Sequence, residues 1–174
     1  MNSFMTWWFA DEKLNLTPKA KKLVQGCLLV YIGFLIYMCF GPQHSSPSGV
    51  ETPNIVYVGP MVFLWVPFNS LVSLGEITSL EQLIWVLGQN IANIFLLYPL
   101  LFGILLWQPQ WRSAKPSLFL AFMISLSIEC TQLLIDILWH ANRVFEVDDL
   151  WTNTLGGVFA YWTFKRLTHL VNKL

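Results

Sequence analysis

Residues 116–138, PSLFLAFMISLSIECTQLLIDIL, decide the fold, because an almost wholly apolar run carries three strongly polar side chains. The run is long enough to cross a bilayer, which takes about 20 predominantly apolar residues. Glu129, Gln132 and Asp136 lie within it. An ionisable group in a bilayer costs about 3 kcal/mol or more unless it is paired or neutralised, and it marks a functional site by default. Glu129 is therefore the starting point for the rest of the chain.

The composition is that of an integral membrane protein. Of the 174 residues, 55% are hydrophobic and only 11% are charged, against about 25% charged in a soluble domain. The formal net charge of zero argues against a nucleic-acid partner. The three cysteines lie in apolar runs and form no CxxC pair, so neither structural disulfides nor a zinc site is predicted.

The predicted fold class is all-α, an integral membrane bundle of four transmembrane helices. Apolar runs of sufficient length predict helices over about 23–40, 83–107, 116–138 and 150–167. Residues 1–22 form a predicted cytoplasmic segment, and 23–170 form the transmembrane domain. A fifth uncharged stretch, 54–74, contains Gly59, Pro60 and Pro67, which interrupt a helix. We expect it to be an interfacial or re-entrant segment on the outer face.

Basic residues predict the orientation. With four spans, nine of the ten Lys and Arg residues fall on one side, which the positive-inside rule assigns to the cytoplasm. Both termini are then expected to be cytoplasmic, and a multi-pass membrane protein is predicted. Only Arg143 lies outside.

The polar residues are predicted to meet in the outer half of the bundle. Helical spacing places Glu129, Gln132 and Asp136 on one face, which must point inward. Glu129 is about 20 Å along its helix from Pro116, at 1.5 Å per residue. Further polar side chains are expected at that depth, namely Asn90, Asn93, Asp149, Thr152 and Asn153. This arrangement predicts a polar site open to the outside.

Arg143 and the acidic pair Asp148 and Asp149 each have two interpretations. Arg143 either forms an ion pair with a nearby carboxylate or only holds the loop between helices three and four. One of Asp148 and Asp149 is expected to be the N-cap of helix four, which leaves the other for a ligand, a cation or Arg143. A hard cation is chemically compatible with Glu129, Asp136, Asp148 and Asp149, but no metal or other cofactor is assigned.

The stretch 127–161 resembles one known family. It reads SIECTQ at 127–132 and RVFEVDDLWTNTLGGVFAY at 143–161. The Glu-x-x-Gln pair, the Arg-x-Phe-Glu-Val-Asp-Asp run and the Asn-Thr-Leu-Gly-Gly run are similar to the VanZ-like family of small bacterial membrane proteins. The similarity extends to Asn93 and to Val66-Pro67-Phe68-Asn69, although the Asn of this last segment follows Pro-Phe. The resemblance implies a role in the cell envelope, and the family's namesake confers teicoplanin resistance.

Two functions are compatible with these residues. The first is binding or remodelling of a lipid or cell-wall-precursor headgroup, with an effect on teicoplanin susceptibility. The second is an intramembrane enzyme for a lipid-linked substrate, with Glu129 as general acid or base and Asp149 as a further catalytic candidate. The expected ligand-binding residues are Glu129, Gln132, Arg143, Asp148, Asp149, Asn153 and Asn93. A third interpretation makes the polar cluster a folding device.

Overall fold

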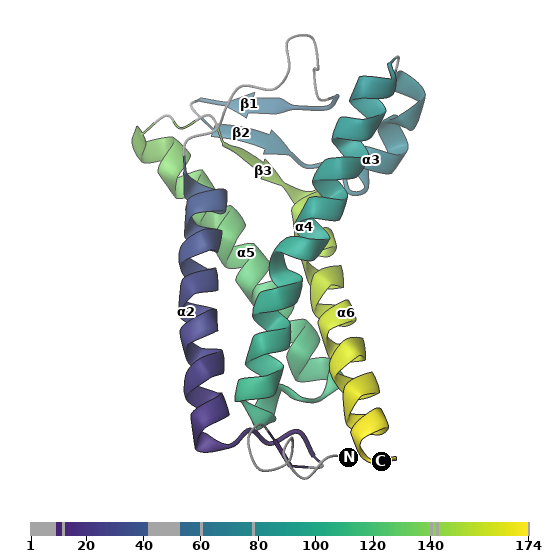
Figure 1. The fold of residues 1–174 in the computed structure, drawn as a ribbon. Coiled ribbons are helices and arrows are strands. Elements are labelled where there is room, and N and C mark those ends of the chain that lie inside the picture. Colours follow the sequence, from purple (N-terminus) through teal and green to yellow (C-terminus); the bar gives the residue numbers. More distant parts are fainter. Residues whose placement is uncertain are drawn as a thin grey trace.

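Four long helices form a bundle, and a small sheet lies across one end of it (Figure 1). The structure is a computed structural model that describes residues 10–11, 13–41, 53–59, 61–77, 79–139, 141 and 143–173. The long helices are α2 (Pro18–Phe40), α4 (Leu80–Trp107), α5 (Ala114–Trp139) and α6 (Val147–Val171). Each contains the corresponding predicted helix, so the four predicted helices are confirmed as helices.

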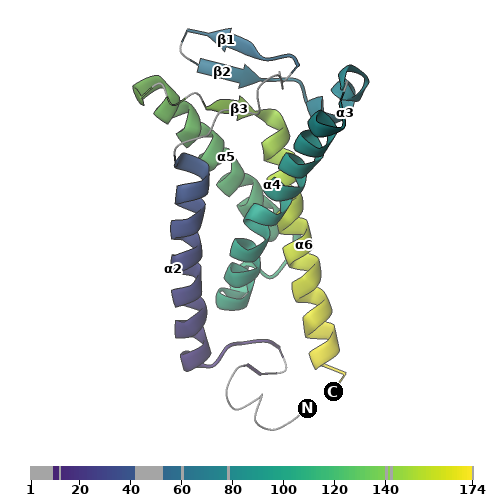
Figure 2. The same ribbon diagram turned by 45° about the horizontal axis from the view of Figure 1, so that its top comes forward.

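The sheet and two short helices occupy the end where α2 finishes and α6 begins (Figure 2). We call this the sheet end, and the opposite end the terminal end. The strands are β1 (Val56–Val58), β2 (Met61–Leu64) and β3 (Val144–Glu146), and the short helices are α3 (Asn69–Val72), η1 (Ser73–Glu76) and η2 (Pro109–Trp111). Of these, η2 lies apart from the sheet, in the connection between α4 and α5.

The predicted fold class of all-α is wrong for the sheet end. β1 pairs antiparallel with β2, and β2 pairs parallel with β3, with Phe63 opposite Phe145. The residues of these strands are mostly β-branched or aromatic, which suits a pleated sheet, and Gly59 adopts a φ of 61° in the turn between β1 and β2. Segment 54–74 therefore forms a hairpin followed by short helices rather than a single span.

Within the part of the chain that the structure describes, three helices are long and apolar enough to cross a membrane, namely α2, α4 and α5. The fourth predicted span, α6, is not among them. It carries Asp148 and Asp149 in its first turn and Lys165 and Arg166 near its end. Three of the four expected spans are therefore candidate membrane-spanning helices by length and composition, and the expectation of four spans is not confirmed.

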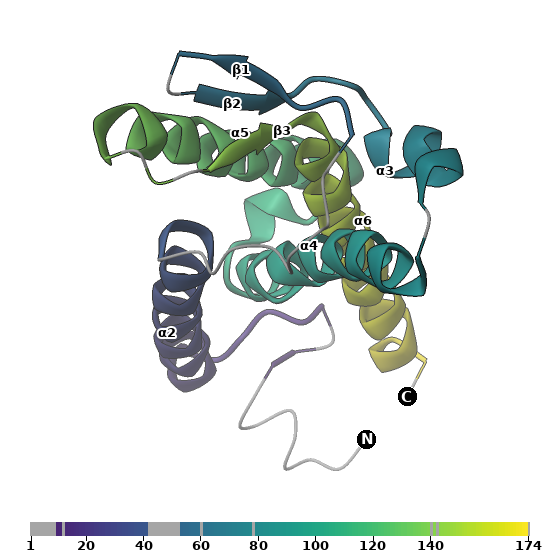
Figure 3. The same ribbon diagram turned by 90° about the horizontal axis from the view of Figure 1, so that it is seen from above.

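Glycines allow α6 to pack closely between α4 and α5. A Cβ at Gly156 would lie 2.2 Å from the carbonyl oxygen of Ile94 in α4, and one at Gly157 would lie 2.5 Å from the Cβ of Ala121 in α5. Figure 3 shows α4 between α2 and α6 when the bundle is seen from the sheet end. Buried leucines of α4, including Leu97 and Leu101, fill the centre of the bundle.

Arg112 holds the terminal end together. Its Nε donates to the carbonyl of Leu105 at 2.7 Å, and its Nη2 donates to the carbonyls of Leu106 and Leu14 at 2.9 Å. Its guanidinium also lies 5.1 Å from the ring centroid of Phe164 in α6. The carbonyls at the end of α4 and the segment before α2 are thereby joined by one cation.

Replacing Gly156 by Ala is expected to destabilise the fold by about 1–3 kcal/mol, because the added methyl group has no room beside the Ile94 backbone. Gly88→Ala in α4 is the matched control, since a Cβ there meets nothing within 4 Å. That variant should be neutral or more stable, because Ala favours a helix over Gly by about 1 kcal/mol. Thermal unfolding of the purified protein in detergent measures both, and equal shifts would contradict the close packing.

Candidate functional site

Glu129 lies on the buried face of α5, next to the start of α6. It is 1% exposed, and its Oε2 accepts a hydrogen bond of 3.1 Å from the backbone N–H of Glu146 at the end of β3. The side chain of Asp149 in α6 is its direct neighbour. Glu129 and Asp149 therefore face each other across the α5–α6 interface.

Asp149 is held by amide and hydroxyl groups of its neighbours. The Nδ2 of Asn93 in α4 donates to its Oδ1 at 2.5 Å. Ser125 of α5 donates to its backbone carbonyl at 3.1 Å and accepts a hydrogen bond of 3.1 Å from the Nδ2 of Asn153. Three helices thus contribute to the position of this carboxyl group.

Glu146 is the third carboxyl group at this position. Its Oε1 accepts a hydrogen bond of 3.2 Å from Gln89 of α4. Burial, with the acidic neighbours Asp149 and Asp148, raises the pKa of Glu146 to about 8. We call Glu129, Glu146 and Asp149 the carboxyl cluster. Glu129 is closed off from solvent, whereas Glu146 and Asp149 are each partly exposed.

Asp148 is a structural residue in this arrangement. Its Oδ2 accepts hydrogen bonds from the backbone N–H and the hydroxyl of Ser70 in α3, at 3.0 and 2.8 Å. Its Oδ1 accepts one of 3.0 Å from the indole of Trp151. Oδ2 therefore holds α3 against α6, and Oδ1 is used within the first turn of α6.

The predicted N-cap of helix four is wrong. The N-cap residue of α6 is Glu146, without a side-chain capping bond, and Asp148 and Asp149 lie in the first turn. The helix begins earlier than predicted because Val147 continues directly from β3. The acidic first turn still suits the positive end of the helix dipole.

Gln132, Asp136 and Arg143 form a separate group, which we call the α2 anchor. Gln132 donates to the carbonyl of Cys39 at 2.9 Å, and the guanidinium of Arg143 donates to the carbonyl of Gly41. The Oδ1 of Asp136 accepts a hydrogen bond of 3.1 Å from the backbone N–H of Arg143. No basic residue lies in the last turn of α2, so Arg143 supplies the cation that the negative end of that helix favours.

The expected pairing of Arg143 with a carboxylate is not seen among the described residues, where its guanidinium hydrogen bond goes to a backbone carbonyl. The interpretation in which Arg143 holds the loop agrees with this geometry. Burial lowers the pKa of Arg143 from its ordinary value. Of the predicted ligand-binding residues, the structure brings together Glu129, Asp149, Asn153 and Asn93, and it places Gln132 and Arg143 at the end of α2.

Sequence reasoning missed Glu146, Gln89 and Ser125. Glu146 ends a strand, so helical spacing gave no indication of its direction. Within the described residues, no group of three or more His, Cys, Asp or Glu side chains is arranged to hold a metal ion. The Oδ1 of Asn153 and the Oδ2 of Asp136 are buried without a hydrogen-bond partner in the described structure.

Comparison with known proteins identifies the family. The model of the VanZ/LLP1 family matches residues 28–169. The chain belongs to the VanZ/LLP1 family. The match covers all four long helices except the first residues of α2 and the last of α6, and it includes the carboxyl cluster and the α2 anchor. No curated protein and no solved structure matches the chain. The VanZ/LLP1 assignment, together with three apolar helices, establishes a membrane protein at the level of the family.

The stability of this VanZ/LLP1 protein is expected to fall as the pH rises from about 4.5 to about 8. The pKa of Glu146 in the folded state is raised from 4.5 to about 8, so the folded state binds its proton more tightly than the unfolded state does. The contribution is complete below the unfolded value and is lost as the pH rises through the folded one. Thermal unfolding between pH 5 and 9 measures it.

Glu146→Gln is the variant that tests this assignment, because the amide cannot ionise and still accepts from Gln89. Its unfolding temperature should depend less on pH than that of the wild type. The charged groups that face Glu146 are Glu129, Asp148 and Asp149. Parallel pH curves for the two proteins would contradict the raised pKa of Glu146.

Proposed function

We propose that the protein binds or remodels the headgroup of a lipid or lipid-linked envelope precursor at the carboxyl cluster. In this proposal all four long helices cross the membrane, the sheet end faces the outside, and both termini are cytoplasmic. The basic residues support that orientation, because nine of the ten lie toward the terminal end and only Arg143 lies at the sheet end. Altered teicoplanin susceptibility is an expected consequence.

The observation that carries the proposal is a buried acidic cluster whose hydrogen-bond donors are neutral. Glu146 and Asp149 receive amide donors from Gln89 and Asn93, and Glu129 receives a backbone N–H. Neutral donors solvate a carboxylate without cancelling its charge. A ligand with an ammonium group and hydroxyl groups would supply both the charge and the donors. The free acceptor Oδ1 of Asn153 lies next to Ser125 and adds a further partner for such a group.

Arg143 was expected to bind the ligand, but it has a structural part in this proposal. Because its guanidinium donates to the carbonyl of Gly41, it fixes the end of α2 and is not assigned a contact with the headgroup. The amine-bearing part of a headgroup is then the part that the cluster recognises. Glu146 and Asp149 make the first contact, since they are the partly exposed members.

Replacing Glu146 by Gln is expected to weaken the binding of phosphatidylethanolamine about tenfold, because a hydrogen bond to a charged group contributes about 1.5–3 kcal/mol. Retention of the lipid by the purified full-length protein, followed by native mass spectrometry, measures the effect. Phosphatidylglycerol, which has no amine, should bind equally to both proteins.

Glu81→Gln is the matched control, since Glu81 is an exposed acid in the first turn of α4. It should retain the wild-type preference for the aminolipid. In cells, the teicoplanin phenotype should change with Glu146→Gln and not with Glu81→Gln at equal membrane levels. Unchanged aminolipid binding in Glu146→Gln would remove the basis for headgroup recognition at the cluster.

The alternative function is an intramembrane enzyme with Glu129 as general acid or base. The adjacent carboxyl groups of Glu129 and Asp149 favour it, because general acid–base catalysis uses positioned carboxyl groups. No nucleophile adjacent to a base is evident among the described residues, which makes binding the better-supported function.

If the protein is an enzyme, the wild type should convert a component of an envelope lipid extract into a product. The Glu129→Gln variant should not form that product. The incubation includes samples with and without divalent cations, and mass spectrometry follows the lipids. Thermal unfolding of Glu129→Gln shows that the variant is folded. Absence of turnover under all of these conditions argues against an enzyme.

A further inference from the structure

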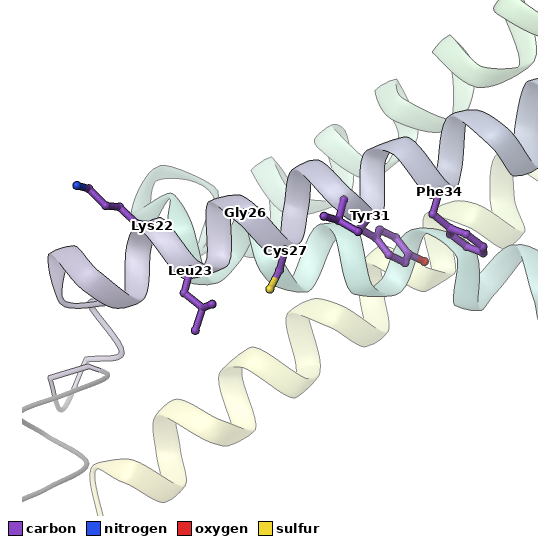
Figure 4. A pocket seen from close by; sticks show the side chains of 7 residues that line it. Lys22, Leu23, Gly26, Cys27, Tyr31 and Phe34 are labelled. Carbon is purple, nitrogen blue, oxygen red and sulfur yellow. The ribbon is translucent and has the colours of Figure 1, made fainter.

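We propose that a groove along α2 binds one anionic phospholipid from the leaflet at the terminal end. The groove has a volume of about 780 Å³ and begins at Lys22. Beyond Lys22 it is lined by Leu23, Gly26, Cys27, Val30, Tyr31 and Phe34 (Figure 4). This site is separate from the carboxyl cluster and does not rest on the function proposed for it.

The lining residues all lie on one face of α2, so the groove is an open apolar face of that helix. Leu23, Val30 and Phe34 are exposed, and a Cβ at Gly26 would meet nothing within 4 Å, so the glycine leaves a notch in the helix face. The hydroxyl of Tyr31 donates to the carbonyl of Leu96 in α4 at 2.8 Å, which fixes the tyrosine ring at the α2–α4 boundary. A flexible hydrocarbon chain fits such a notched face.

The length of the groove corresponds to one leaflet. Lys22 and Phe34 are separated by twelve residues, or about 18 Å at 1.5 Å per residue. One leaflet contributes about 15 Å of a ~30 Å hydrocarbon core. The groove therefore accommodates a single acyl chain from the terminal side, rather than a ligand that passes through the membrane.

The charge at the end of the groove selects an anionic headgroup. Among the described residues that line the groove, Lys22 is the one charged side chain and none is acidic. It lies in the N-terminal part of α2, where the helix dipole also favours an anion. An apolar face that ends at a cation is complementary to an amphiphile with a negative head. A second copy of the chain fits less well, because parallel contact through this face would bring two Lys22 side chains together.

Native mass spectrometry of the full-length protein with phosphatidylglycerol and phosphatidylcholine of identical acyl chains tests the site. The wild type should retain one phosphatidylglycerol in preference to phosphatidylcholine. Gly26→Leu fills the notch and should lose the retained lipid without a change in unfolding temperature. Lys22→Gln should lower the preference for phosphatidylglycerol about fivefold, as expected for one basic residue near anionic lipid.

Gly33→Leu and Lys21→Gln are the matched controls, since neither residue lines the groove and Gly33 also has nothing within 4 Å of an added Cβ. Both should retain the wild-type behaviour. Equal lipid retention by Gly26→Leu and Gly33→Leu, or no selectivity change in Lys22→Gln, would overturn the proposal. Rapid Cys27–Cys27 crosslinking in a Cys130→Ser protein would instead identify a second copy as the occupant, which also overturns it.

Discussion

The close approach of α6 to α4 and α5 is the constraint on which the rest of the structure depends. At Gly156 there is no space for a Cβ beside the carbonyl of Ile94, and at Gly157 there is little beside Ala121. Helices in lipid gain no hydrophobic stabilisation from one another and associate through such close packing. Asp149 precedes Gly156 by two helical turns and Asn93 precedes Ile94 by one residue. The same approach therefore brings this amide to this carboxyl group.

Burial of several acids in one place needs compensation, and the structure supplies it with neutral donors. Both carboxylate oxygens of Asp148 accept hydrogen bonds, from Ser70 and from Trp151. This residue therefore has a structural role. The carboxyl cluster differs, because each member receives a donor but none receives a cation among the described residues. Burial and the acidic neighbours raise the pKa of Glu146 to about 8, so a proton on Glu146 balances part of this charge. A purely structural cluster would not need three adjacent carboxyl groups with two of them partly exposed.

Hydropathy predicted the four helices because apolar length is a local property of the chain. The meeting of Glu129, Asp149, Asn153 and Asn93 also followed from helical depth and spacing. The strands did not, because Val62 pairs with Val144, which is distant in the sequence. Spacing also places Gln132 on the face of Glu129 but does not say which neighbour it meets, and the structure directs it to the end of α2. The sequence could not predict the hydrogen bond from Arg143 to the carbonyl of Gly41, because every residue has a backbone carbonyl that could accept it.

The two polar groups at the sheet end explain how α2 is attached to the bundle. Its buried residues are only Ala20, Leu28, Leu35 and Cys39, a narrow stripe for a helix of 23 residues. The α2 anchor compensates at one end by binding the carbonyls of Cys39 and Gly41, and Tyr31 adds a bond to α4 near the middle. Since these bonds fix α2 at its sheet end and centre, its terminal half can leave an apolar face open without losing its position. A helix held in this way keeps its place in the bundle with only a narrow buried stripe, which leaves its other residues free to face lipid.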